Sequence, residues 1–135
     1  MKKVFCCIVA LVLAVSMAVS VFAIDFGYGV MPYYEYFGNY NVDLYRINGT
    51  TVESTAYFEA NSYTYRLVAD CSLQKKGFLG IWSNVETWNV TVYSGSINDV
   101  RTFAVDESGT YRLKVELKAY YKLEKEEATF YSREV

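Results

Sequence analysis

Apolar and polar residues alternate with a period of two along most of the chain after residue 39. A period of two places successive side chains on opposite faces of a strand, whereas an amphipathic helix would repeat every 3.6 residues. Turn signals such as Asn48-Gly49 and Ser94-Gly95 separate the alternating runs. The pattern predicts seven strands, at residues 40–47, 51–60, 63–75, 78–92, 97–105, 110–123 and 128–133.

Seven short strands that each carry one apolar face are typical of two antiparallel sheets packed face to face. The turn before the sixth predicted strand, Glu107-Ser108-Gly109-Thr110-Tyr111, matches the D/E-x-G-x-Y pattern of a tyrosine corner. In this motif the Tyr ring is buried and its hydroxyl bonds to backbone a few residues upstream. Gly109 is expected there because a tight backbone path favours glycine. The sequence therefore predicts an all-β fold, an immunoglobulin-like antiparallel β-sandwich, with Tyr111 and Gly109 as structural residues.

Residues 1–23 have the features of a secretory signal peptide. Lys2 and Lys3 precede an uncharged apolar run that ends in Val21-Phe22-Ala23, which suits signal peptidase. The run is about 20 residues long, enough to span a bilayer, so a membrane anchor formed by an uncleaved N-terminal segment is the alternative. We expect a signal peptide at 1–23, a Tyr-rich N-terminal segment at 24–39, a sandwich domain at 40–135, and a secreted, extracellular protein.

Composition argues against several chemistries. The chain has no histidine, which excludes Ser-His or Cys-His nucleophile pairs and histidine metal sites. Cys71 is the one cysteine outside the predicted signal peptide. Lysine and arginine total 13 against 15 acidic residues, and no basic stripe points to nucleic acid. We therefore expect no metal, no cofactor, no nucleic-acid partner and no catalytic activity; a small carboxylate-dependent hydrolase is the alternative, although no spacing pairs two carboxylates.

Two groups of aromatic residues are candidates for ligand contact. Trp82 and Trp88 are an even number of residues apart, so a regular strand would place both on one face as a stacking platform for a sugar. The other interpretation assigns at least one of them to the core, the usual place for a Trp in an immunoglobulin-like sandwich, with a bulge shifting the phase. The second group is a Tyr-rich candidate binding surface that consists of Tyr28, Tyr33, Tyr34, Tyr36 and Tyr40. Tyrosines are enriched at interfaces, but these rings would also serve to cap an open end of the sandwich.

Two stretches of the chain resemble a known group of proteins. CSLQKKGFLGIWSNVETW and SGTYRLKVELKAY are similar to a hairpin and a strand of small secreted single-domain immunoglobulin-like proteins of Gram-positive bacteria. The resemblance covers residues 52–131 and leaves 24–45 unmatched. It implies an exported single domain, and it carries over no site residues because the group has no assigned activity.

These observations favour a secreted non-catalytic binding or structural module of unknown ligand. A carbohydrate-binding module that uses Trp or Tyr stacking is the alternative. We expect a partner such as a cell-wall glycan or an extracellular protein to contact residues 26–40 and the neighbouring edge strand, and no membrane contact after signal cleavage. Deletion of residues 24–38 is expected to leave the sandwich folded.

Overall fold

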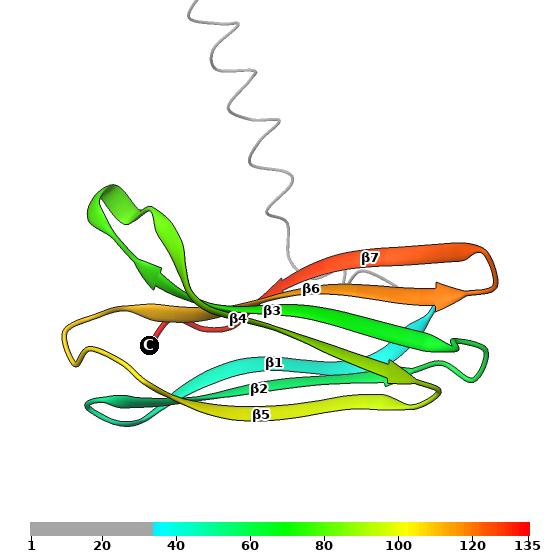
Figure 1. Ribbon diagram of the computed structural model, residues 1–135, viewed down its shortest axis with the longest axis horizontal. Helices are drawn as coiled ribbons and strands as arrows, with labels where there is room; N and C mark the ends of the chain where they lie inside the picture. The colour runs from blue at the N-terminus through cyan, green and yellow to red at the C-terminus, as the bar shows by residue number, and fades with distance from the viewer. Residues whose placement is uncertain (1–33) are drawn as a thin grey trace, which may run out of the picture. The chain divides into compact units, whose positions relative to one another are not determined.

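The computed structural model describes residues 34–135, which form a β-sandwich of two antiparallel sheets (Figure 1). The predicted signal peptide, Tyr28 and Tyr33 lie outside these residues. The strands are β1 (Phe37–Asn48), β2 (Thr51–Ala60), β3 (Arg66–Lys76), β4 (Trp82–Tyr93), β5 (Ser96–Ala104), β6 (Tyr111–Tyr121) and β7 (Glu124–Tyr131). The alternation along the chain therefore predicted all seven strands, although several of their ends differ.

The strand order identifies the sandwich as immunoglobulin-like. One sheet has the order β1-β2-β5 and the other β4-β3-β6-β7. With β1, β2 and β5 taken as immunoglobulin strands A, B and E, and β3, β6 and β7 as C, F and G, both sheets have the immunoglobulin order. β4 pairs with β3 along its length, so it extends the sheet of β3, β6 and β7 rather than the opposite one.

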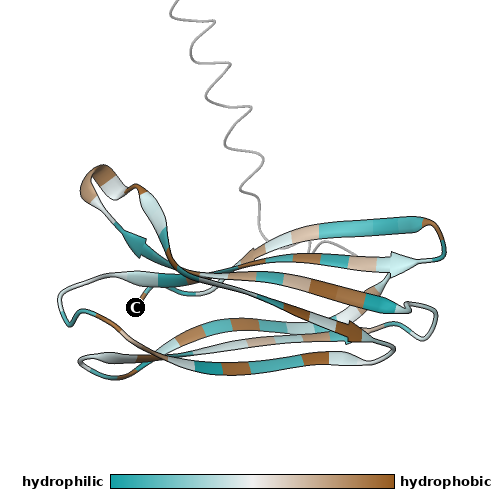
Figure 2. Ribbon diagram, in the orientation of Figure 1, coloured by the Kyte–Doolittle hydropathy of each residue, from teal (hydrophilic) through white to brown (hydrophobic). Residues whose placement is uncertain are grey.

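The core lies between the two sheets, where every second side chain of the central strands is buried. Apolar positions recur along the strands of both sheets, as Figure 2 shows. The largest fully buried side chains from the three central strands β2, β3 and β6 are Val52, Phe58, Leu67, Leu73, Leu113, Val115 and Leu117. Removal of this apolar surface from water is the main term that stabilises such a fold. Cys71 is part of the same core and forms no disulfide.

Four strands begin three or four residues away from their predicted starts. β3 begins at Arg66 rather than Tyr63, and β4 begins at Trp82 rather than Phe78. β1 begins at Phe37 rather than Tyr40, and an irregularity in its register with β2 follows Phe37. The last strand was predicted to begin at Ala128, but the charged residues Glu124–Glu127 already belong to β7; the chain turns at Lys122, whose φ is 53°. β7 is an edge strand, and charged side chains are common on edges because they oppose pairing with other chains.

Candidate functional site

The tyrosines of the predicted binding surface that lie in the described part of the chain pack against the core. Tyr36 is buried, and its hydroxyl donates a hydrogen bond to the Glu124 carboxylate, which raises the pKa of Tyr36 to about 12. The half-buried Tyr34 stacks on Phe37 with 4.3 Å between ring centroids. Tyr40 is also half-buried against the core. Tyr36 is therefore a core residue rather than part of a contact surface, and the interpretation of these rings as an end cap fits Tyr34 and Tyr40 as well.

Backbone hydrogen bonds fix the same segment to both sheets. The Glu126 carboxylate accepts hydrogen bonds from the backbone N–H groups of Glu35 and Tyr36, at 3.0 and 3.1 Å. The Tyr36 carbonyl accepts one from the backbone of Asn61 at 3.1 Å. Phe37, the next residue, is only 1% exposed. Deletion of residues 24–38 would thus remove buried side chains and their hydrogen bonds, which contradicts the expectation that the sandwich tolerates it.

Trp88 belongs to the core side of β4. Its ring packs against Phe103 with 5.0 Å between centroids, and its indole N–H donates to Asp99 at 2.8 Å. Trp82 lies on the other side of the strand, because the register of β3 and β4 shifts after Leu73. One extra residue in β4 at this shift reverses the side on which later residues lie. The two tryptophans therefore do not form one sugar-stacking platform.

The faces of Trp82 are in contact with cationic side chains. The guanidinium of Arg112 lies 4.2 Å from the Trp82 ring centroid and 4.3 Å from that of Tyr131. The Arg112 Nε also donates to Gln74 at 2.8 Å. Such cation–π contacts are stabilising when the cation lies over the ring. Arg112 thus lies over the rings of Trp82 and Tyr131 and competes with a sugar for stacking on that face of each ring.

Tyr111 and Gly109 form the tyrosine corner. The backbone N–H of Asp106 donates to the Tyr111 hydroxyl at 3.0 Å, and the Tyr111 ring is 2% exposed. Gly109 does not have a positive φ. A Cβ at this position would lie 2.6 Å from Cε2 of the Tyr111 ring. Glycine is therefore required because the ring packs on its backbone, which differs from the conformational reason that the sequence suggested.

The two aspartates whose pKa is shifted are engaged in structural contacts. Asp43 accepts two hydrogen bonds from Arg133, at 2.6 and 2.7 Å, and these hold the pKa of Asp43 below its ordinary value. Lys75 lowers the pKa of Asp106 in the same way. A general acid needs a carboxyl pKa that is raised instead. Among residues 34–135, no group of three or more Asp, Glu or Cys is arranged to hold a metal ion.

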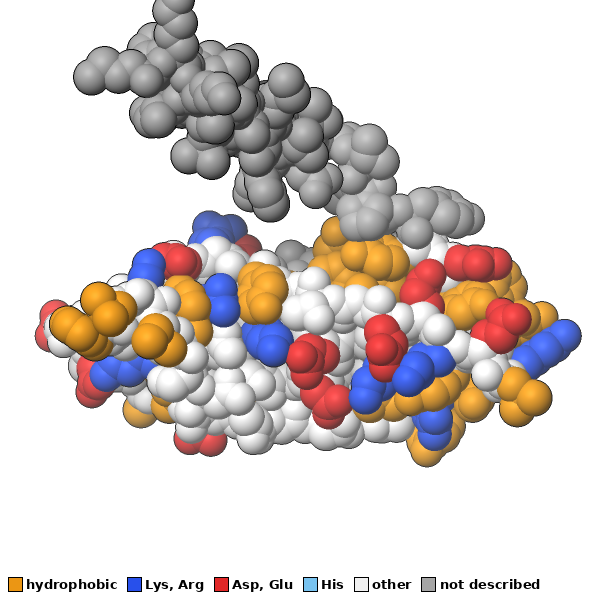
Figure 3. Space-filling model, turned by 90° about the horizontal axis from the view of Figure 1, so that it is seen from above, with side chains coloured by type: hydrophobic (Ala, Val, Ile, Leu, Met, Phe, Trp, Pro, Cys, Tyr) orange, Lys and Arg blue, Asp and Glu red, His pale blue; other side chains and the backbone are white. Residues whose placement is uncertain are grey.

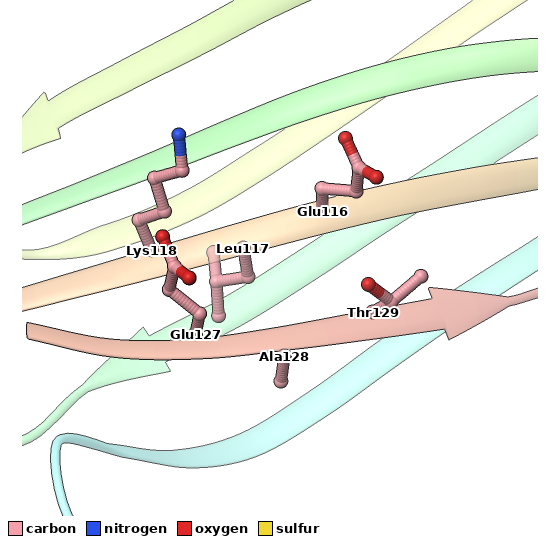
Figure 4. Close-up of a pocket in the computed structure, with 6 residues that line it drawn as sticks. All are labelled: Glu116, Leu117, Lys118, Glu127, Ala128 and Thr129. Atoms are coloured by element: carbon pink, nitrogen blue, oxygen red, sulfur yellow. The ribbon is translucent and has the colours of Figure 1, made fainter.

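A shallow hollow of about 340 Å³ lies along β6 and β7 (Figure 4). Its lining residues are Glu116, Leu117, Lys118, Glu127, Ala128 and Thr129. Glu116 is paired with Lys114 at 3.0 Å, and Glu127 with Lys125 at 2.9 Å. Both acids therefore already have a cationic partner on their own strand, as is common for charged side chains on a solvated sheet face.

The strongest candidate for a contact site is the end of the β3–β4 hairpin, which we call the arm (residues 74–84). It begins at the register shift after Leu73 and bends away from the body of the sandwich (Figure 1). Its tip (residues 77–81) contains a 3-10 turn, Phe78–Gly80, in which the N–H groups of Gly80 and Ile81 donate to the carbonyls of Gly77 and Phe78 at 3.2 and 3.3 Å. The Gly77 N–H donates to the Ile81 carbonyl at 2.7 Å and closes the end of the hairpin. Bulges bend strands in this manner and often re-aim side chains at functional positions.

The tip exposes three large apolar side chains together. Phe78 is 87% exposed, Leu79 80% and Ile81 66%. Figure 2 shows apolar residues at this turn, and Figure 3 shows apolar side chains gathered at the same end of the molecule. Single exposed apolar residues are normal, whereas a group of them at the end of a projection is a candidate for an interaction site.

The charge pattern of the arm separates its tip from its base. Residues 77–85 contain no charged side chain, and Lys75 and Lys76 directly precede them. Lys75 pairs with Asp106, and Lys76 lies 3.5 Å from Glu134 and 5.6 Å from the Trp82 ring centroid. The arm thus combines an uncharged tip with a base that carries lysines and a Trp.

The alternation of apolar and polar residues did not reveal this site. It predicted a strand over residues 78–92, in which half of the apolar side chains would have faced the core. The signal in the sequence was Gly77 and Gly80 on either side of Phe78-Leu79, a pattern that favours a turn over a strand.

No protein-family model matches this chain, and no curated protein shows significant similarity to it. In the part of the chain that the structure describes, no helix is long and apolar enough to cross a membrane.

Proposed function

We propose that the protein is an exported, non-catalytic binding module that contacts its partner through the tip of the β3–β4 arm. The observation that carries the proposal is the exposure of Phe78, Leu79 and Ile81 at the end of a projecting hairpin. Folding gains nothing from three exposed apolar side chains, because apolar surface stabilises a protein only when it leaves water. A partner that covers them accounts for their presence.

The distribution of polar groups supports a role in binding rather than catalysis. Asp43, Asp99 and Asp106 are held by hydrogen bonds to Arg133, Trp88 and Lys75. The thiol of Cys71 is buried, and burial raises its pKa to about 12, so it is protonated at neutral pH. The thiolate is the reactive form of cysteine, and a buried protonated thiol acts as a small apolar side chain. Export rests on the predicted signal peptide at residues 1–23.

A retention assay on washed cells of the producing organism tests this proposal. The exported wild type is compared with a triple variant, Phe78→Ser with Leu79→Asn and Ile81→Thr, which keeps the length of the tip. Leu123→Ser is the matched control, since Leu123 is fully exposed at another hairpin turn. We expect the triple variant to be retained at least tenfold less than the wild type, and the control to be retained equally.

Equal retention of the triple variant and the wild type would contradict a role for the tip. The rival class, a carboxylate-dependent hydrolase, is tested by incubation with polysaccharide and peptide substrates. Turnover that is abolished by substitution of one Asp or Glu, with the fold intact by circular dichroism, would replace the proposal of a non-catalytic module.

A further inference from the structure

We infer that the surface contacted by the arm is a lipid bilayer, into whose headgroup–acyl boundary the tip inserts. This inference rests on the proposed function and names its partner. It departs from the sequence-based expectation of no membrane contact after signal cleavage. That expectation considered only residues 1–23 as a membrane-seeking segment, and the exposure of the tip became visible only in the structure.

The shape and chemistry of the tip fit a fluid apolar phase. Phe78, Leu79 and Ile81 are all exposed, and they lie in the turn at the end of a hairpin that projects from the sandwich (Figure 1). A protein partner would need a preformed pocket for such a projection, whereas acyl chains rearrange around it. The uncharged stretch 77–85 also avoids the cost of carrying a charge into an apolar medium.

The residues at the base of the arm match the polar boundary of a bilayer. Trp82 follows the tip directly and is half-buried, and Trp is enriched where lipid headgroups meet acyl chains. Lys75 and Lys76 precede the tip, and lysine side chains extend toward headgroup phosphates while their stems remain in apolar surroundings. Lys76 makes a long, exposed contact with Glu134, at 3.5 Å, and its ammonium lies 5.6 Å from the Trp82 ring centroid. Exposed ion pairs of this kind contribute little to stability. The charge of Lys76 is therefore available for an anionic headgroup, which supplies the charge complementarity.

The backbone of Leu79 is an independent indication that its side chain serves a contact. Leu79 has φ 59° and ψ 19°, in the left-handed region. Glycine and asparagine adopt this conformation readily, but it is unfavourable for leucine. The side chain is 80% exposed and so gains little from packing within the described residues. A leucine here weakens the turn and leaves apolar surface in water, so it does not serve the stability of the fold. We therefore attribute it to binding.

The geometry limits the contact to shallow insertion. The tip comprises five residues, 77–81, between β3 and β4. Apolar groups on peripheral proteins enter the interface by about 5–10 Å. A single tip of this size therefore gives reversible binding, and it does not act as a permanent anchor.

Vesicle sedimentation tests the inference with the exported protein. Mass spectrometry first establishes that the wild type and all variants share one N-terminus, so that differences between them report the tip. Two kinds of vesicle are used, phosphatidylcholine alone and an equal mixture of phosphatidylcholine and phosphatidylglycerol. We expect the wild type to bind both, more tightly to the anionic mixture. The triple variant should bind at least tenfold more weakly, and Leu123→Ser should bind like the wild type.

Three single variants sharpen the test. Leu79→Asn should weaken vesicle binding several-fold while its urea midpoint stays equal or rises, because Asn suits the left-handed backbone; a folding defect would lower both. Lys76→Gln should weaken binding to the anionic mixture only. Phe78→Trp should give a fluorescence signal that vesicles with brominated acyl chains quench.

The outcomes separate this inference from the proposed function. Absence of wild-type binding to both vesicles, or equal binding by the triple variant, overturns the bilayer as partner. If the tip still controls retention on cells in that case, the partner is a protein or a glycan, and the proposed function stands. If the tip affects neither vesicles nor cells, both proposals fail.

Discussion

Substitution of Tyr111 by Phe removes a single oxygen atom from the tyrosine corner. That oxygen accepts a hydrogen bond from the backbone N–H of Asp106 at 3.0 Å, and the donor is only partly buried. An unpaired buried donor costs about 1–3 kcal/mol. Because the Asp106 N–H is partly accessible to water, we expect the free energy of unfolding to fall by about 1–2 kcal/mol. With a urea m-value of about 1–3 kcal/mol/M, the midpoint falls by roughly 0.3–2 M.

Urea unfolding followed by tryptophan fluorescence measures this change, since Trp88 contacts the core through Phe103. Tyr93→Phe is the matched control, because it deletes the same atom from a ring that is 70% exposed. The control should change stability by less than about 0.5 kcal/mol. An unchanged midpoint for Tyr111→Phe, or an equal shift in the control, would refute the assignment of a stabilising corner.

Gly109→Ala tests the other half of the motif. The new Cβ would lie 2.6 Å from Cε2 of the buried Tyr111 ring, and overpacking of this kind costs about 1–3 kcal/mol. The clash is with the ring carbon, so the cost should persist when Tyr111 is already Phe. A loss that disappears in the double variant would mean that the hydroxyl, rather than the ring, excludes the side chain.

Three further predictions concern the end cap, the thiol and the C-terminal ion pair. Phe37→Ala should cost about 3–5 kcal/mol, because the ring on which Tyr34 stacks is 1% exposed in the core; a wild-type urea midpoint would contradict the burial of this ring. Cys71 should resist a thiol reagent in native protein at pH 8 and react in urea, because burial raises its pKa to about 12; rapid native labelling would show an open thiol. The pKa of Asp43 is lowered by Arg133, so its contribution is present above about pH 4 and lost as pH falls; Asp43→Asn should flatten acid destabilisation between pH 5 and 2, and an unchanged acid profile would contradict this.

The sequence by itself determined the fold class of the described residues. Alternation fixes which side of a strand is buried, because side chains repeat every two residues. The run from Tyr111 to Tyr121 shows this most clearly, and it is the central strand β6. Glu107-Ser108-Gly109-Thr110-Tyr111 located the tyrosine corner, since that motif depends on contacts within a few residues of chain. The alternation and the tyrosine-corner motif could thus be read from the sequence, because both depend on residues that are close together in the chain.

Tertiary structure alone decided which aromatic and apolar side chains are buried and which are exposed. The spacing of Trp82 and Trp88 predicted one shared face, but the register shift after Leu73 depends on how β4 pairs with β3. Composition marked Tyr36 as a contact residue, yet the Glu124 carboxylate that accepts its hydrogen bond lies 88 residues further along the chain. The apolar residues Phe78, Leu79 and Ile81 look like core residues in sequence. They are exposed because the arm bends beyond the reach of the opposite sheet (Figure 1), and burial depends on what a neighbouring element covers, which no residue encodes by itself.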